Sequence, residues 1–222
     1  MVPEVRHAGF VDQGRSEGGG EADSVERIWA GSNASQHDEG PLAQRKSGGP
    51  FHPEEWQTHV HETDWAGIKD NPLLWGSFLW VMFDFQVASR HEGSQMNLND
   101  KGLVTQDRKT KKDSYFFYQA NWTDKPMVHI ASSQMTPRRL ASTDVEVFSN
   151  CAKVELTVNG TSLGTVAPDD VKVFRWSNVT LQPGKNEVQA TATSDQGAIS
   201  DSCEWVLDPN SAPPPPPPSD MK

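Results

Sequence analysis

The sequence has no run of about 20 apolar residues, the length that a membrane-spanning helix needs. Its N-terminus also lacks the apolar segment of a signal peptide. Apolar residues make up only 35% of the 222 residues, against roughly 45–50%, glycine included, in an ordinary globular protein. We therefore predict no membrane span and some unstructured chain, and no targeting signal indicates a compartment.

Cysteine and positive charge are scarce as well. Cys151 and Cys203 are too few for a disulfide framework, and we favour isolated buried thiols over a pair. The formal net charge of −10 argues against a nucleic-acid partner, because affinity for phosphates comes mostly from clustered Lys and Arg. We interpret the one basic run, residues 108–112, as a solvated turn.

Both ends of the chain are expected to be unstructured. Residues 1–29 contain three consecutive glycines and scattered charges, without a helical or strand period. Residues 210–222 hold six consecutive prolines, which predict a stiff tail or linker. A ligand for a proline-recognising domain is the alternative for this tail.

The middle of the chain carries helix and strand signals. Residues 50–65 show amphipathic helical spacing, with Pro53 where a first helical turn tolerates it. The most apolar run, LLWGSFLWVMFDF at residues 73–85, predicts a fully buried strand. Residues 89–112 are predicted to be a polar loop, and residues 114–122 a helix packed against that strand.

After residue 126 the pattern becomes all-β. Short runs alternate apolar and polar residues, and Asn159-Gly160 and Pro183-Gly184 mark reversals between them. We predict an immunoglobulin-like sandwich over residues 126–209, with its last strand ending near Leu207. The predicted strands lie at residues 145–148, 153–158, 171–176 and 186–191.

Three segments resemble glycoside hydrolases of family 2, the β-galactosidase and β-glucuronidase family. Residues 48–85 resemble the last helix-and-strand region of the catalytic barrel, and residues 99–122 resemble the loop and helix that follow it. Residues 145–165 resemble the sandwich domain after the barrel. The resemblance implies an α/β barrel remnant, the last β/α unit of a TIM barrel, over residues 30–125, followed by the sandwich.

The resemblance also implies sugar-binding residues. Trp80 stands in the triplet Phe78-Leu79-Trp80, where the family places a tryptophan under the sugar, and an indole face suits the apolar face of a pyranose. Asp84 resembles an acidic residue of the same segment. The alternatives are a core tryptophan and a surface carboxylate.

A second implied site is the tripeptide Asn99-Asp100-Lys101. β-Glucuronidases carry an asparagine-any-lysine motif there, which holds the substrate carboxylate, and lysine with an amide donor is a sound carboxylate receptor. Similar loops occur in β-galactosidases, so both substrate classes stay open. His37 and Asn33 are further candidates for contacts with sugar hydroxyls, with surface and turn roles as the alternatives.

Retaining members use two glutamates about 5–5.5 Å apart, and the family's serine-glutamate-tyrosine-glycine motif is absent here. The residues before Ala30 are Glu26-Arg27-Ile28-Trp29. These can be encoded GAG-CGA-ATA-TGG, which one base later reads as the missing motif. Our hypothesis is that residues 1–29 are an out-of-frame translation; a divergent N-terminus is the alternative.

The sequence thus predicts a β-galactosidase-like retaining exo-glycosidase that lacks both catalytic glutamates and is inactive as this chain alone. A β-glucuronidase-type substrate and a non-catalytic carbohydrate-binding or spacer module are the alternatives. The expected partner is a carbohydrate, with no cofactor. We predict no metal, because His52, His59 and His61 have no partner cysteines.

Overall fold

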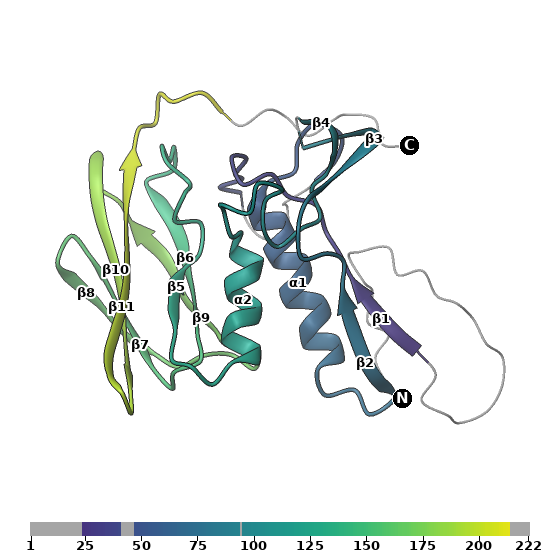
Figure 1. Ribbon diagram of the computed structural model, residues 1–222. Helices are drawn as coiled ribbons and strands as arrows, with labels where there is room; N and C mark the ends of the chain where they lie inside the picture. Colours follow the sequence, from purple (N-terminus) through teal and green to yellow (C-terminus); the bar gives the residue numbers. More distant parts are fainter. Residues whose placement is uncertain (1–23, 41–46, 94, 214–222) are drawn as a thin grey trace, which may run out of the picture.

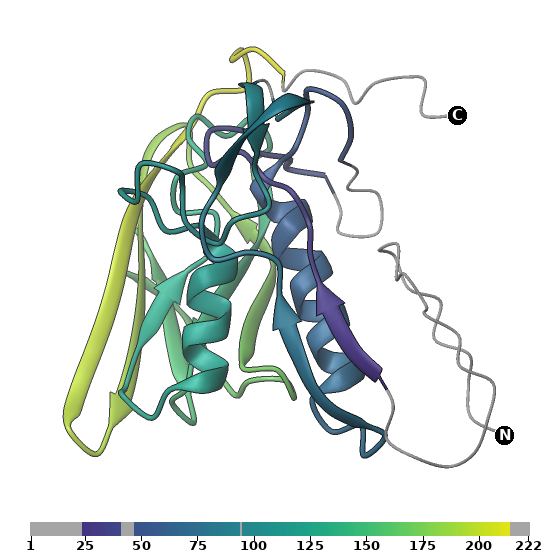
Figure 2. The same cartoon turned by 45° about the vertical axis from the view of Figure 1, so that its right-hand side comes forward.

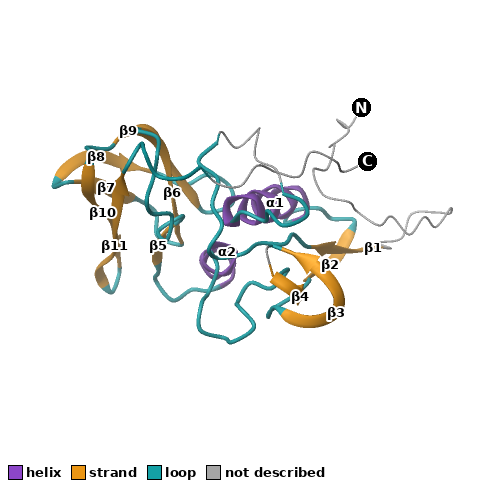
Figure 3. Ribbon diagram, turned by 90° about the horizontal axis from the view of Figure 1, so that it is seen from above, coloured by secondary structure: helices purple, strands orange, loops and turns teal. Residues whose placement is uncertain are grey.

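The structure is a computed structural model that describes residues 24–40, 47–93 and 95–213. It is arranged in layers (Figure 1), with a β-sandwich on one side, two helices in the middle and the strands β1 to β4 on the other. The view from above shows the helices between the sandwich and these strands (Figure 3). Residues 1–23 and the polyproline stretch after Pro213 lie outside the described residues.

The first unit is a parallel β-α-β arrangement. Strand β1 (Ser24–Ile28) pairs in parallel with β2 (Leu74–Leu79), and α1 (Glu54–Ile68) connects them. Figure 2 shows the two strands side by side next to α1. Because residues 1–29 were expected to be unstructured, this part of the prediction is wrong for residues 24–28. The pairing with β2 supplies the backbone hydrogen bonds that the local sequence does not predict.

The prediction of a fully buried strand over residues 73–85 is also wrong. The strand ends at Leu79, and the exposed fractions of Leu73, Trp75 and Phe78 are 69%, 65% and 60%. Among the described strands, β2 pairs with β1 alone, so one edge and much of its side-chain surface have no covering layer. An apolar run shows that a segment can be buried. Whether it is buried depends on which neighbouring elements pack against it.

The predicted loop over residues 89–112 contains strands. β3 (Phe85–Glu92) and β4 (Gln95–Asn99) form an antiparallel hairpin whose register shifts between Gln86 and His91. This irregular register breaks the strict alternation by which a strand is recognised in a sequence.

The helix predicted at residues 114–122 is confirmed as α2 (Asp113–Trp122). Its buried residues Phe117 and Tyr118 form a core cluster with Phe148 of β6, while Leu79 and Phe83 pack against that cluster from the apolar run. The apolar run therefore packs against the cluster to which the helix belongs, and the helix also packs on the sandwich.

The all-β prediction is confirmed by two sheets. One has the order β5-β6-β9 and the other β11-β10-β7-β8, around a core that includes the fully buried Trp205. Cys151 and Cys203 are free thiols; Cys151 is buried, as favoured, whereas Cys203 is only half-buried. The strands are β5 (Val128–Ile130), β6 (Ser142–Ser149), β7 (Val154–Val158), β8 (Thr161–Val166), β9 (Val173–Thr180), β10 (Gly184–Ser194) and β11 (Gly197–Leu207).

The predicted reversals are also present. Asn159 and Gly160 both have positive φ, 51° and 75°, and join β7 to β8. Two such residues are what a two-residue hairpin loop needs. The last strand ends at Leu207, where it was expected.

Candidate functional site

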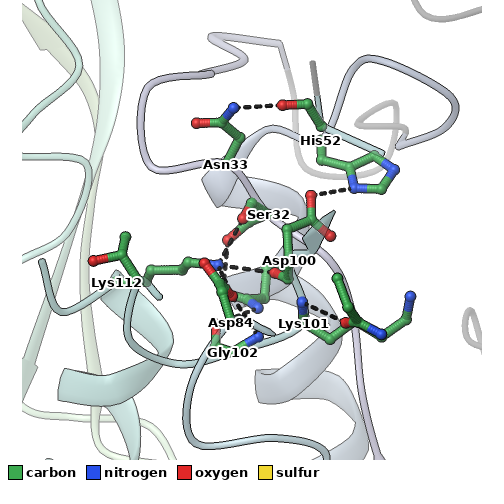
Figure 4. Close-up of polar contacts among 12 residues, drawn as sticks. Ser32, Asn33, His52, Asp84, Asp100, Lys101, Gly102 and Lys112 are labelled. Atoms are coloured by element: carbon green, nitrogen blue, oxygen red, sulfur yellow. Dashed lines mark hydrogen bonds and ion pairs between the residues drawn. The ribbon is translucent and has the colours of Figure 1, made fainter. Parts of the chain in front are cut away.

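A buried lysine connects the loops at one end of the β-α-β unit. Lys112 is fully buried, and its Nζ donates to Ser32 O at 2.6 Å, Asp100 O at 2.8 Å and Asp84 Oδ1 at 2.9 Å (Figure 4). An ammonium group has three N–H donors, so these three acceptors satisfy it completely.

Asp84 receives two of the hydrogen bonds at this junction. Its Oδ1 accepts from Lys112 Nζ and, at 2.7 Å, from the backbone N–H of Gly102. Burial raises the pKa of Asp84 to about 6, against the opposing attraction of Lys112. The side chain is therefore buried between these two donors and does not lie on the surface.

Gln57 of α1 ties the same loops together from the helix side. Its Oε1 accepts from the hydroxyls of Ser32 and Ser114, and its Nε2 donates to the carbonyls of Ala30 and Gly102. Because one buried amide makes all four hydrogen bonds, it fixes the positions of α1, residues 30–32, Gly102 and Ser114 relative to one another.

The tripeptide Asn99-Asp100-Lys101 begins with the last residue of β4 and is buried. Asn99 Oδ1 accepts from the backbone N–H of Lys101 at 3.1 Å, which sets the orientation of the amide. Lys101 Nζ lies 4.9 Å from the ring centroid of Trp29, within the range of a cation–π contact. Asp100 pairs with His52, with 2.6 Å between Oδ2 and Nδ1.

Trp80 lies at the end of β2 and is 40% exposed. Its backbone N–H donates to Ile28 O, its ring contacts Phe85 edge-on at 6.1 Å, and Arg27 lies 5.2 Å from its centroid. The indole is therefore not a core side chain in the described structure, and part of its surface is exposed.

The remaining two candidates lie in different places. Asn33 lines a pocket of about 490 Å³ together with Asp84 and Asp100, and its amide oxygen accepts from the backbone N–H of Ser35. His37 borders a separate pocket of about 190 Å³ and contacts Glu55 at 2.8 Å. Burial opposes ionisation of Glu55, but the contact with His37 and backbone hydrogen bonds, including one from the Asp38 N–H, together outweigh burial and lower the pKa of Glu55.

Sequence reasoning missed Lys112, Gln57 and the pair His52–Asp100. The only available signal was position: Lys112 immediately precedes a helix, and Asp100 lies inside a recognised motif. In the part of the chain that the structure describes, no three or more His, Cys, Asp or Glu side chains form a group that fits a metal ion. None of its described helices is long and apolar enough to cross a membrane.

Comparisons with known proteins find relatives of this chain in sequence and in fold. A model of a domain of unknown function, DUF4982, matches residues 141–199. A β-glucuronidase of Bacteroides fragilis is 40% identical over 70% of the chain and 22% of its own length. The chain thus spans less than a quarter of that relative.

Two solved structures are similar in fold. A putative β-galactosidase of Bacteroides fragilis has a TM-score of 0.76 and 37% identity over 82% of this chain and 27% of its own. A β-glucuronidase of Parabacteroides merdae has a TM-score of 0.74 and 27% identity over 83% of this chain and 25% of its own. In sequence and in fold, the chain corresponds to the C-terminal region of glycoside hydrolases of family 2.

Proposed function

We propose that this chain is the part of a β-glucuronidase-type glycoside hydrolase that binds the sugar ring and its carboxylate. The observation that carries the proposal is the short, buried loop that holds Asn99 and Lys101 in one fixed arrangement. The relatives named β-glucuronidase support the acid-sugar choice over the β-galactosidase-like substrate that the sequence favoured.

The chemistry of the loop suits a carboxylate. An ammonium group and an amide N–H are both donors, and a carboxylate ion accepts only. Because Asn99 Oδ1 already accepts from the Lys101 N–H, the Asn99 Nδ2 donors point away from that contact. The half-exposed indole of Trp80 would support the apolar face of the sugar.

The proposal includes a retaining mechanism for the complete enzyme and no turnover by this chain alone. The family resemblance puts the nucleophilic glutamate on the strand before the loop of residues 30–40. In this chain that strand is β1, whose sequence SVERI lacks the motif. The codons of Glu26 to Trp29 in the gene test the out-of-frame hypothesis, which fails if the shifted frame does not encode serine-glutamate-tyrosine-glycine.

One of the two alternatives has specific support. A β-galactosidase-type substrate is favoured by the similarity to the putative β-galactosidase of Bacteroides fragilis. The other alternative, a non-catalytic binding sandwich, has less support, because the sandwich tryptophans Trp176 and Trp205 are buried in its core.

Binding of methyl glycosides to the 222-residue chain tests the proposal. We expect methyl β-D-glucuronide to bind more tightly than methyl β-D-galactoside in an NMR titration. Lys101→Met should weaken glucuronide binding about ten-fold or more, the effect of one charge-assisted hydrogen bond, and leave galactoside binding unchanged. Lys125→Met, at an exposed lysine, is the control. A preference for the galactoside would instead support the first alternative.

A further inference from the structure

We propose that His52 and Asp100 are positioning residues that hold the Asn99–Lys101 loop in the shape that selects an acidic sugar. This inference rests on the proposed function, because it assigns the loop's specificity to a pair of side chains behind it. In this proposal, neither side chain contacts the substrate.

The side chain of Asp100 is packed behind the loop. Asp100 is 1% exposed, and its Oδ2 lies 2.6 Å from His52 Nδ1. Its other oxygen, Oδ1, is buried and has no hydrogen-bond partner within the described residues. A buried carboxylate oxygen without a partner destabilises the fold, so stability alone does not account for an acidic residue here.

Two glycines on different segments make room for this carboxylate. A Cβ on Gly31 would lie 2.4 Å from Asp100 Oδ1, and a Cβ on Gly93 would lie 2.2 Å from Oδ2. Both distances are far shorter than van der Waals contact. The carboxylate is therefore wedged between the segment after β1 and the β3–β4 turn, and its side chain cannot rotate without moving one of them.

The backbone of Asp100 is held as well. Its carbonyl oxygen accepts from Lys112 Nζ at 2.8 Å and from the Ser32 N–H at 3.0 Å. With the side chain bound to His52, both ends of the residue are fixed. Asn99 and Lys101 stand on either side of it, so their donors keep one relative orientation. Preorganised donors bind a ligand with a smaller loss of conformational entropy.

Hydrogen exchange and glycoside binding test the proposal on the 222-residue chain. The variants are His52→Ala, which removes the contact, and His52→Asn, which keeps an N–H near the position of Nδ1. The control is His129→Ala, because His129 of the sandwich strand β5 forms a comparable pair with Asp113 at 2.8 Å.

We expect His52→Ala to weaken binding of methyl β-D-glucuronide about ten-fold, with galactoside binding unchanged. Amide exchange of Lys101 and Gly102 should accelerate, while the β10 amides stay protected and show that the chain is folded. His52→Asn should restore both properties in large part, and His129→Ala should change neither.

The outcomes separate this inference from the proposed function. A wild-type chain without a glucuronide preference overturns both. A preference that His52→Ala leaves intact, with unchanged exchange at Lys101, overturns only the positioning role, and so does a His52→Asn variant that behaves like His52→Ala.

Discussion

At the scale of single residues, the buried ammonium of Lys112 holds the site together. It joins the segment after β1, the loop after β4 and Asp84, three parts of the chain that are distant in sequence. A buried ion pair adds little stability compared with apolar side chains in its place. Removing only one partner is costly, because the other charge is then buried without an opposite charge beside it.

The variant Lys112→Met should therefore destabilise the chain by about 3–5 kcal/mol, the usual cost of breaking a buried pair. The pKa of Asp84, which burial already raises to about 6, should rise further without the lysine. Urea denaturation measures the first effect. Lys111→Met is a matched control at the adjacent, exposed lysine, and an equal loss of stability in both variants would contradict this role for Lys112.

At the scale of secondary-structure elements, α1 and α2 meet through a polar contact inside an apolar layer. His61 of α1 is fully buried, its Nδ1 lies 3.0 Å from the Tyr118 hydroxyl of α2, and the two rings meet edge to face. Burial, and to a smaller extent the positive charge of Lys112, lowers the pKa of His61 from 6.5 to about 3.

This contact predicts a pH dependence of stability. Between pH 6.5 and about 3 the unfolded chain binds a proton at His61 and the folded chain does not. The stability from His61 is thus fully present above pH 6.5 and is lost as the pH falls, by up to about 1.4 kcal/mol per pH unit.

Replacing His61 by Gln should remove that slope. Burial raises the pKa of Glu54 and of Glu62 well above the usual range, and these groups act in the opposite direction in both proteins. The free energy of unfolding of His61→Gln should therefore be compared with that of the wild type at each pH. Parallel curves would show that His61 is not buried in its neutral form.

At the scale of the whole molecule, the helices and the sandwich share a core. Phe148 of β6 is fully buried and packs against Phe117 of α2, with ring centroids 5.7 Å apart. Arg175 of β9 also binds Glu62 of α1 at 2.6 Å and Glu146 at 3.0 Å. The domain boundary predicted between residues 125 and 126 therefore crosses a packed interface.

We expect Phe148→Ala to destabilise the chain by about 3–5 kcal/mol and to accelerate amide exchange in α2. Phe174→Ala removes an equally buried ring that belongs to the sandwich core alone, and it should affect the β10 amides more than α2. Identical exchange patterns in the two variants would mean that the helices and the sandwich unfold as one unit. Residues 30–125 expressed alone should be poorly ordered, because they lose the surface around Phe148.

The sequence by itself determined the elements whose pattern is local. The helix at α2, the alternating strands of the sandwich and the Asn159-Gly160 turn were predictable because their signals lie within a few neighbouring residues. The tripeptide around Asp100 was also found, through its resemblance to a known motif.

Only the tertiary structure decided which of these residues act together. Lys112 looked like one more surface charge, and His52 like an isolated histidine, until the fold brought Asp100 to both of them. The apolar run at residues 73–85 failed as a prediction for the same reason. Burial and pairing depend on partners that are distant in sequence, and no local pattern specifies whether those partners are present.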